Sequence, residues 1–259
     1  MTGPQGDGRG GTGAGAPASL PDDRSGASPS AGVVADRLAE LSREVVACCR
    51  CPRLVEWRER VARVAPPRYA GQEYWARPVP GFGDPAARVL VVGLAPAAHG
   101  GNRTGRIFTG DRSGDWLFAA LHRAGFADRP RSLHRDDGLR LSGAYIAAAV
   151  RCAPPANRPL PEERDRCLPY LVREMDLLVG ARTLVCLGAF AWDAALRALA
   201  ARDHRVAPRP RFAHLAEAAV GPYRLLGSYH PSQQNTFTGK LTEPMFDAVF
   251  ARARELAGL

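Results

Sequence analysis

The sequence lacks several features that would place it in large classes of protein. It has no uninterrupted run of about 18 apolar residues, so no membrane-spanning helix is predicted. Its first residues have neither the basic start nor the apolar core of a signal peptide, and we therefore expect a cytoplasmic protein. The glycine-rich loop of residues 93–111 contains neither of the phosphate-binding patterns GxGxxG and GxxxxGK[ST], which argues against the two common nucleotide-binding loops at that position.

Lysine is almost absent, since Lys240 is the only one in the chain. Lys and Arg together number 35 against 26 Asp and Glu, which gives a formal net charge of +9. Residues 1–32 hold two arginines and three aspartates, so the positive excess belongs to the rest of the chain. A GC-rich codon bias would explain arginine in place of lysine, but not the excess of basic residues. A basic folded body indicates a polyanionic partner.

Large apolar residues are nearly missing from the start of the chain. Residues 1–31 are mostly Gly, Ala, Ser, Pro and Asp, which cannot bury enough surface to offset their ordering entropy. We therefore predict a disordered tail over residues 1–32. From residue 33 onward apolar residues recur at helical spacing, and residues 33–259 are long enough to bury one substantial core. A single domain is expected there.

Four short apolar segments are predicted to be strands: residues 89–92, 144–150, 183–187 and 223–228. Helical patterns lie between or after them, at residues 116–121, 162–178 and 246–256. Strands that alternate with helices predict an α/β fold of three layers, α/β/α, with a central four-stranded parallel sheet. In such folds the ligand site lies in the loops beyond the carboxyl ends of the strands.

The most informative stretch follows the first predicted strand and reads GLAPAAHGGNRTGRIFTGD, residues 93–111. On spacing alone it could be an ordinary connection between a strand and a helix. It resembles, however, the first motif of the family 5 (type-5) uracil-DNA glycosylases. His230-Pro231-Ser232 matches the second motif of that superfamily, and VRCAPPANRP, residues 150–159, matches the cysteine-bearing loop of its iron–sulfur branches. The resemblance covers roughly residues 41–256 and implies the uracil-DNA glycosylase-like fold.

The chain contains six cysteines. In an intracellular protein these are more often metal ligands or core residues than disulfides. Cys48 and Cys51 form a CxxC pair, whereas fourteen residues separate Cys152 from Cys167. The wide second pair argues against a zinc ribbon, but the spacings of iron–sulfur clusters vary more. From spacing alone, a metal site and scattered core cysteines both remain open.

The resemblance implies a [4Fe–4S] cluster with a structural role, held by Cys48, Cys51, Cys152 and Cys167. Cys49, next to the first ligand, could replace Cys48. Cys186 lies inside a predicted strand and is most simply a small buried hydrophobe.

The activity that the resemblance implies is hydrolysis of the N-glycosidic bond of uracil in DNA. Breaking that bond leaves positive charge on the sugar and negative charge on the base, so a catalyst must stabilise an oxyanion and hold the nucleotide outside the stack. We predict that His230 donates a hydrogen bond to the oxyanion. Phe108 is expected to stack on the flipped base, and Gly93, Ala95 and Ala148 to line the base pocket.

The residue that places the attacking water is harder to predict. Many members of the superfamily carry a carboxylate before the proline of the first motif, but Ala95 stands there and cannot be a general base. Asn102 and Asn157 could orient water without deprotonating it, which suffices for a dissociative mechanism, although both could simply form turns. Asp111 is the nearest carboxylate and ranks behind them, as a helix cap or a partner of the cation. Ala148 replaces the asparagine of narrowly uracil-specific relatives, so we expect activity on hypoxanthine and xanthine also.

Contacts with DNA are predicted for two kinds of residue. An apolar wedge that offsets the cost of unstacking is expected from Phe237 or Leu241. Lys240 could attack the sugar as in bifunctional glycosylases, but a lysine beside a strand-end loop is more often a phosphate contact. The predicted polar contacts are Arg103, Arg106, Ser232 and Lys240. The expected partner is double-stranded DNA with deaminated bases, with single-stranded DNA as a further candidate, bound by a monomer.

Two other classes of function fit parts of the sequence. One is a non-catalytic iron–sulfur protein that binds nucleic acid through its arginines, and the other is a hydrolase of small nucleotides. A uracil-containing duplex separates the three, because only a monofunctional glycosylase both binds the duplex and leaves alkali-labile abasic sites in it.

Overall fold

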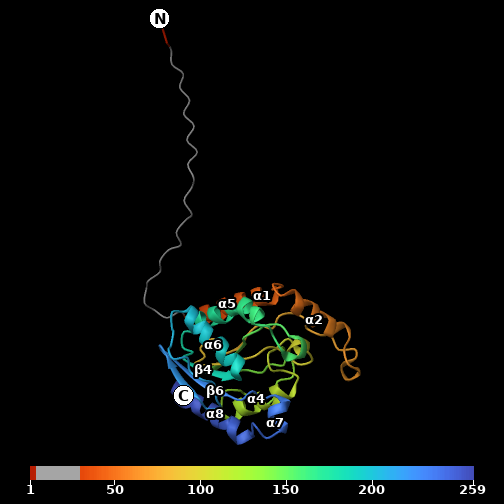
Figure 1. The fold of residues 1–259 in the computed structure, drawn as a ribbon. Coiled ribbons are helices and arrows are strands. Elements are labelled where there is room, and N and C mark those ends of the chain that lie inside the picture. The colour runs from red at the N-terminus through yellow and green to blue at the C-terminus, as the bar shows by residue number, and fades with distance from the viewer. Residues whose placement is uncertain (4–29) are drawn as a thin grey trace.

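The computed structural model describes residues 1–3 and 30–259. The six strands of this part form one sheet in the order β1-β3-β2-β4-β6-β5, with helices on both faces (Figure 1). Most of the tail predicted to be disordered, residues 4–29, lies outside the described residues. Helix α1 (Ala31–Val46) begins with Ser30 as its N-cap, so the predicted boundary after residue 32 is wrong by two residues. The capping hydroxyl starts the helix one turn before its first large apolar side chains.

The centre of the sheet is parallel, as predicted. It consists of β2 (Val89–Gly93), β3 (Ala144–Ala148), β4 (Thr183–Leu187) and β6 (Tyr223–Ser228). Every residue of β2, β3 and β4 is buried. Helices cover both faces of the sheet, so these strands must be apolar throughout rather than alternating, which is why the sequence revealed them.

The predicted central sheet of four parallel strands is confirmed, and two short antiparallel strands, which were not predicted, extend it to six. Strand β1 (Phe82–Gly83) pairs with β3, and β5 (Glu217–Val220) pairs with β6. A strand of two residues inside a Pro- and Gly-rich loop has too few positions to show a period. Strand β5 lies at the sheet edge and is largely exposed, so it lacks the apolar run of a buried strand.

Two hydrophobic clusters lie on opposite faces of the sheet, beneath the helices that cover it (Figure 1). Helices α1, α5 (Pro161–Leu177) and α6 (Ala189–Ala201) cover one face, and the sequence analysis did not predict α6. Helices α4 (Arg112–Arg123) and α8 (Glu243–Ala257) cover the other face. The three-layer α/β/α prediction is therefore confirmed.

The remaining elements are short or lie beside the sheet. Helix α2 (Pro52–Arg63) follows the CxxC pair, and the 3-10 turn η1 (Pro67–Tyr69) follows α2. Three short elements come after strand ends: α3 (Gly101–Thr104), η2 (Pro155–Asn157) and α7 (Gln233–Phe237). None of the helices in the described ranges has the length and apolarity needed to cross a membrane.

Candidate active site at the carboxyl edge of the sheet

The four parallel strands bring the predicted motifs to one edge of the sheet. Gly93 at the end of β2 pairs with Ala148 at the end of β3, and the N–H of Ala149 donates to the carbonyl of Gly93 at 2.9 Å. On the other side, the N–H of Gly188 after β4 donates to the carbonyl of Ser228 at 2.8 Å. The loops that carry the first motif, the Pro-Pro-Ala-Asn turn and His-Pro-Ser therefore leave the sheet at the same edge.

His230 lies two residues beyond β6, with its ring centroid 5.8 Å from that of Phe108. Burial lowers the pKa of His230 to about 4, and no neighbouring charge or hydrogen bond among the described residues counteracts it. The imidazole is therefore neutral at physiological pH, with one N–H to donate. The amide of Asn235 holds the His-Pro-Ser loop by donating to the backbone carbonyl of His230 at 2.9 Å.

Phe108 is held in an unusual position. Its backbone has φ = +52°, a left-handed conformation that is uncommon for a bulky residue and often marks a functional site. Its ring lies directly on the end of β2, where a Cβ added to Gly93 would be 2.5 Å from the ring edge. Gly93 is thus needed as glycine, because any side chain there would displace the aromatic ring.

Of the other two residues predicted to line the base pocket, Ala148 pairs with Gly93 across the sheet and Ala95 follows Gly93 by two residues. Ala148 is buried at the end of β3. Ala95 is half-buried and packs against a cluster that contains Cys51 and Cys152. The loop of the first motif therefore runs from the Phe108 ring to the cysteines.

The two asparagines predicted to orient water have different surroundings. Asn157 is exposed in η2 with φ = +55°, so its amide is open to solvent and ligand. Asn102 is 1% exposed, and its Nδ2 donates to the carbonyls of Arg58 (3.2 Å) and Ala98 (3.4 Å). These contacts tie the first motif to α2. Its role in orienting water stays a prediction, whereas Asn157 has the accessible amide.

Asp111 is the N-cap of α4, where its Oδ1 accepts from the N–H of Gly114 at 3.0 Å. Burial raises its pKa, and hydrogen bonds from the backbone of the first helical turn oppose the effect. The carboxylate thus has the capping role that was one of its two predicted roles.

Two of the predicted DNA contacts are wrong because the side chains face the interior. Arg106 is 3% exposed, and its Nη1 forms a buried ion pair with Oδ1 of Asp137 at 2.8 Å. Leu241 is 0% exposed and belongs to the hydrophobic core beneath α4 and α8. Nothing local in a polar loop shows whether an arginine or a leucine turns inward, since the partner lies far away in the sequence.

The other predicted DNA contacts are accessible to different degrees. Lys240 is exposed, with Nζ 4.9 Å from the ring centroid of Tyr229. Ser232 is half-buried and caps α7. Arg103 donates to the carbonyls of His99 (2.8 Å) and Gly110 (3.0 Å), so it braces the loop of the first motif. Contacts of these three residues with DNA stay predictions.

Phe237, one of the two predicted wedge residues, has 66% of its surface exposed at the end of α7. The guanidinium of Arg112 lies 4.5 Å from the centroid of its ring. Sequence reasoning missed Arg112, although its position directly after the first motif is a signal that could have suggested it. An exposed aromatic ring beside an arginine presents an apolar tip and a cation on one surface.

The cysteines predicted as ligands lie near one another. Cys51, Cys152 and Cys167 belong to one buried cluster, and Cys48 lies within electrostatic range of all three. Cys49 is exposed, and Cys186 is buried in β4 as the sequence predicted. Within the described ranges, no three His, Cys, Asp or Glu side chains converge as ligands for a single metal ion.

Arginines surround these thiols. Nη1 of Arg58 donates to Sγ of Cys152 at 3.1 Å, and Nε of Arg50 donates to Sγ of Cys48 at 3.5 Å. Burial raises the pKa of Cys152 to about 12, and the guanidinium of Arg58 opposes the effect. At Cys48 burial also acts upward, but hydrogen bonds from Tyr170 and Arg50 outweigh it and lower the pKa. The surroundings of these thiols are therefore positively charged, and three of the four thiols are buried.

Comparison with known proteins identifies the family of this chain. The family model described as the uracil DNA glycosylase superfamily matches residues 80–254. The chain belongs to this superfamily. It is 53% identical to a type-5 uracil-DNA glycosylase of Mycobacterium bovis, over 87% of this chain and 84% of the relative.

Two further type-5 uracil-DNA glycosylases show a similar level of identity. The protein of Mycobacterium leprae is 51% identical over 87% of this chain and 98% of its own length. That of Thermus thermophilus is 52% identical over 83% of this chain and 96% of its own length. The predicted membership in the type-5 family of uracil-DNA glycosylases is confirmed.

Proposed function

We propose that this protein excises uracil from DNA by hydrolysing the N-glycosidic bond, as a monofunctional glycosylase that leaves an abasic site. The observation that carries the proposal is the pair formed by neutral His230 and Phe108 at the carboxyl edge of the sheet. The type-5 relatives, which are about half identical over most of the chain, support the same activity.

In the proposed mechanism, Phe108 stacks on a base that has left the duplex, and His230 donates its N–H to the base oxygen on which charge develops. The electron pair of the glycosidic bond leaves with the base, which later takes up a proton. The sugar cation is captured by the oxygen of a water molecule, which then releases one proton to the solvent. Because a neutral imidazole keeps its proton while it stabilises the oxyanion, it lowers the barrier without becoming an acid catalyst.

Asn157 is the residue we propose to orient the water. Its amide is exposed in the loop that follows β3, and it need not accept a proton if the bond is largely broken before attack. Ala95 offers no carboxylate for a general base, and Asp111 is used as a helix cap. These features favour a dissociative mechanism.

We further propose that Cys48, Cys51, Cys152 and Cys167 hold a [4Fe–4S] cluster. Each iron of such a cluster binds its own thiolate, so the four ligands need not converge on one point. Four neighbouring thiols among the arginines Arg50 and Arg58 suit a group with net negative charge. The cluster would link the segments that follow α1 and β3 to the start of α2 and to the middle of α5. This role is structural.

The range of substrates belongs to the same proposal. Ala148 leaves more room at the end of β3 than an asparagine would, so we propose that hypoxanthine and xanthine are excised as well.

Double-stranded DNA is the proposed partner and single-stranded DNA a second one, with Phe237 as the wedge in a duplex. We also propose that residues 33–259 act as one catalytic domain, as a monomer and in the cytoplasm.

Duplexes that contain uracil, hypoxanthine or xanthine test the function. After incubation with the protein and treatment with alkali, strand breaks at the modified position are expected. His230→Ala should slow single-turnover excision of uracil by about 10²- to 10³-fold, the scale of losing one oxyanion donor. His122→Ala, at an exposed position of α4, is the matched control and should excise at the normal rate. A wild-type protein that binds these duplexes but breaks none of them would leave a non-catalytic iron–sulfur protein as the better interpretation.

A further inference from the structure

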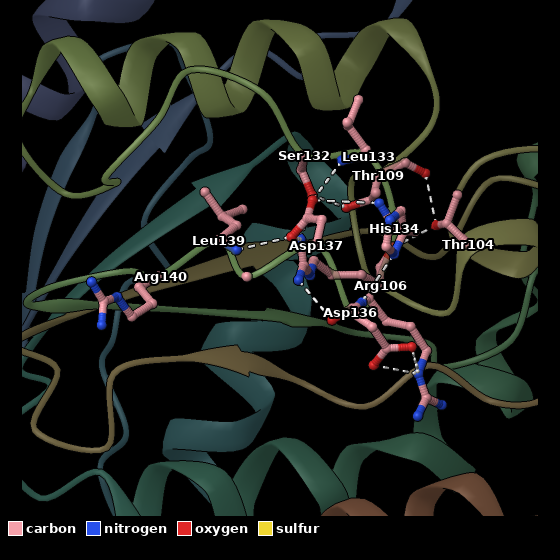
Figure 2. A network of polar contacts seen from close by, with 12 residues as sticks. Thr104, Arg106, Thr109, Ser132, Leu133, His134, Asp136, Asp137, Leu139 and Arg140 are labelled. Atoms are coloured by element: carbon pink, nitrogen blue, oxygen red, sulfur yellow. Dashed lines mark hydrogen bonds and ion pairs between the residues drawn. The ribbon is translucent and has the colours of Figure 1, made fainter.

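A buried network of polar side chains joins the loop of the first motif to the segment 132–139 (Figure 2). Its members come from two parts of the chain that are about 30 residues apart in sequence. They are Thr104, Arg106 and Thr109 in the motif loop, with Ser132 and Asp137 in the facing segment.

Asp137 is the anchor of this network. Its side chain is 5% exposed, and Oδ1 accepts from Nη1 of Arg106 at 2.8 Å and from the N–H of Leu139 at 2.9 Å. Its Oδ2 accepts from the N–H of Leu133 at 2.8 Å. The carboxylate thus shapes its own loop and at the same time fixes the position of one cation.

Arg106 is held on several sides. Besides Asp137, it donates from Nη1 to Oγ of Ser132 and from Nη2 to the carbonyl of Arg135, both at 2.8 Å. Its guanidinium also lies 4.4 Å from the ring centroid of Phe82. A buried guanidinium needs such partners because an unpaired charge in the interior is costly, so the network defines one position for residue 106.

The same network fixes the other end of the segment that carries Phe108. Oγ1 of Thr109 and Oγ of Ser132 share a hydrogen bond of 2.6 Å, and Oγ1 of Thr104 donates to the carbonyl of Thr109 at 3.0 Å. Residues 106 and 109 are therefore both pinned, and Phe108 lies between them with φ = +52°. A strained backbone conformation persists only when the surrounding structure enforces it.

We infer that Asp137 is a positioning residue for base excision: through Arg106 it holds residues 106–109 so that the ring of Phe108 stays between Gly93 and His230. Asp137 itself touches neither base nor reacting atoms, and its effect acts through Phe108. The inference rests on the proposed excision of uracil. It adds the segment 132–139, which no sequence motif pointed to, to the parts of the chain on which catalysis depends.

The test is a double-mutant cycle between positions 137 and 108. Asp137→Asn keeps the shape of the side chain but removes its charge, and Phe108→Ala removes the ring. The rate constant of single-turnover uracil excision at saturating enzyme is measured for the wild type, both single variants and the double variant. We expect Asp137→Asn to slow excision at least tenfold when Phe108 is present, and less than twofold in the Phe108→Ala background. Its affinity for a duplex with an abasic site should stay within about threefold of the wild type.

Two further variants separate positioning from general stability. Asp193→Asn removes the carboxylate that pairs with Arg164 and Arg197 outside the network, and it should leave the excision rate unchanged. Ser132→Ala is a milder change that removes the hydrogen bonds to Thr109 and Arg106. It replaces Asp137→Asn in the cycle if that variant does not fold, and it should slow excision only when Phe108 is present.

Equal slowing by Asp137→Asn or Ser132→Ala in both backgrounds would overturn the inference, because the network would then not act through the ring. A wild-type rate in Asp137→Asn would overturn it too. A wild-type protein that excises no uracil would instead refute the proposed function, so the two failures are distinguishable.

Discussion

The depressed pKa of His230 makes a quantitative prediction about stability and pH. The folded protein holds this imidazole at a pKa of about 4, whereas an unperturbed histidine titrates at 6.5. Between these values the unfolded chain binds a proton that the folded protein does not. By linkage, burial of the ring costs almost no stability well above pH 6.5, and the free energy of unfolding decreases as the pH falls from 6.5 towards 4.

The two pKa values give the size of the effect. At pH 7.5 both states are unprotonated, and His230 costs the folded protein only about 0.1 kcal/mol. At pH 5.0 the same term amounts to about 2 kcal/mol, since only the unfolded chain is largely protonated. His230→Asn removes the titrating group and with it this part of the pH dependence.

Urea denaturation at pH 7.5 and pH 5.0 measures the difference. The free energy of unfolding of the wild type should fall by about 2 kcal/mol more than that of His230→Asn between the two values. His122→Asn changes an exposed histidine and should behave as the wild type does. Parallel losses in the wild type and in His230→Asn would show that His230 is not held neutral by burial.

The pH dependence of excision tests the same reasoning in the catalytic step. A neutral donor keeps its form from pH 8 down to pH 5. The rate constant for excision should therefore show no change near pH 6.5 that is due to His230, and the pH profiles of the wild type and of His230→Asn should have the same shape in that range. A rate that falls as the pH rises through 6.5, and that depends on His230, would mean that the imidazolium is the active donor and would refute the proposed role of the neutral ring.

Three other predictions follow from the site. Purified protein should be brown with about four irons per chain, and colourless protein with one zinc would contradict the cluster. Alanine at any one of the four predicted ligands, Cys48, Cys51, Cys152 or Cys167, should bleach the colour, whereas Cys49→Ala and Cys186→Ala should keep it. Phe237→Ala should slow excision from duplex DNA more than tenfold but from single-stranded DNA less than twofold, because only the duplex needs a wedge; equal slowing of both would argue against that role. Ala95→Asp should give little gain in single-turnover rate, and an acceleration above tenfold would show that water activation limits the wild type.

Much of the fold could be predicted because its central elements carry local signals. Strands β2, β4 and β6 were recognised within one residue, since a parallel strand covered on both faces must be apolar at every position. Edge strands β1 and β5 lack that constraint, and the sequence therefore left them unrecognised.

The position of the site could also be predicted. His230 follows a strand that sequence alone identified, and the loop with Phe108 follows another, so the geometry of a parallel sheet brings both to one edge. The backbone strain at Phe108 and the depressed pKa of His230 could not be read in the same way. Both depend on which atoms surround the residue after folding.

Arg106 shows most clearly where prediction from the sequence ends. In the sequence it is one more basic residue in a loop that was expected to bind DNA. The folded chain turns it inward because Asp137, 31 residues later, supplies a carboxylate at 2.8 Å. Leu241 was misplaced in the same way, since the core beneath α4 and α8 receives it. Sequence alone determined the family, the parallel sheet and the loops that carry the chemistry, because these depend on residues that are neighbours in the chain. The direction of each side chain in those loops was decided only by tertiary structure, because burial and charge pairing join residues that are far apart in the chain.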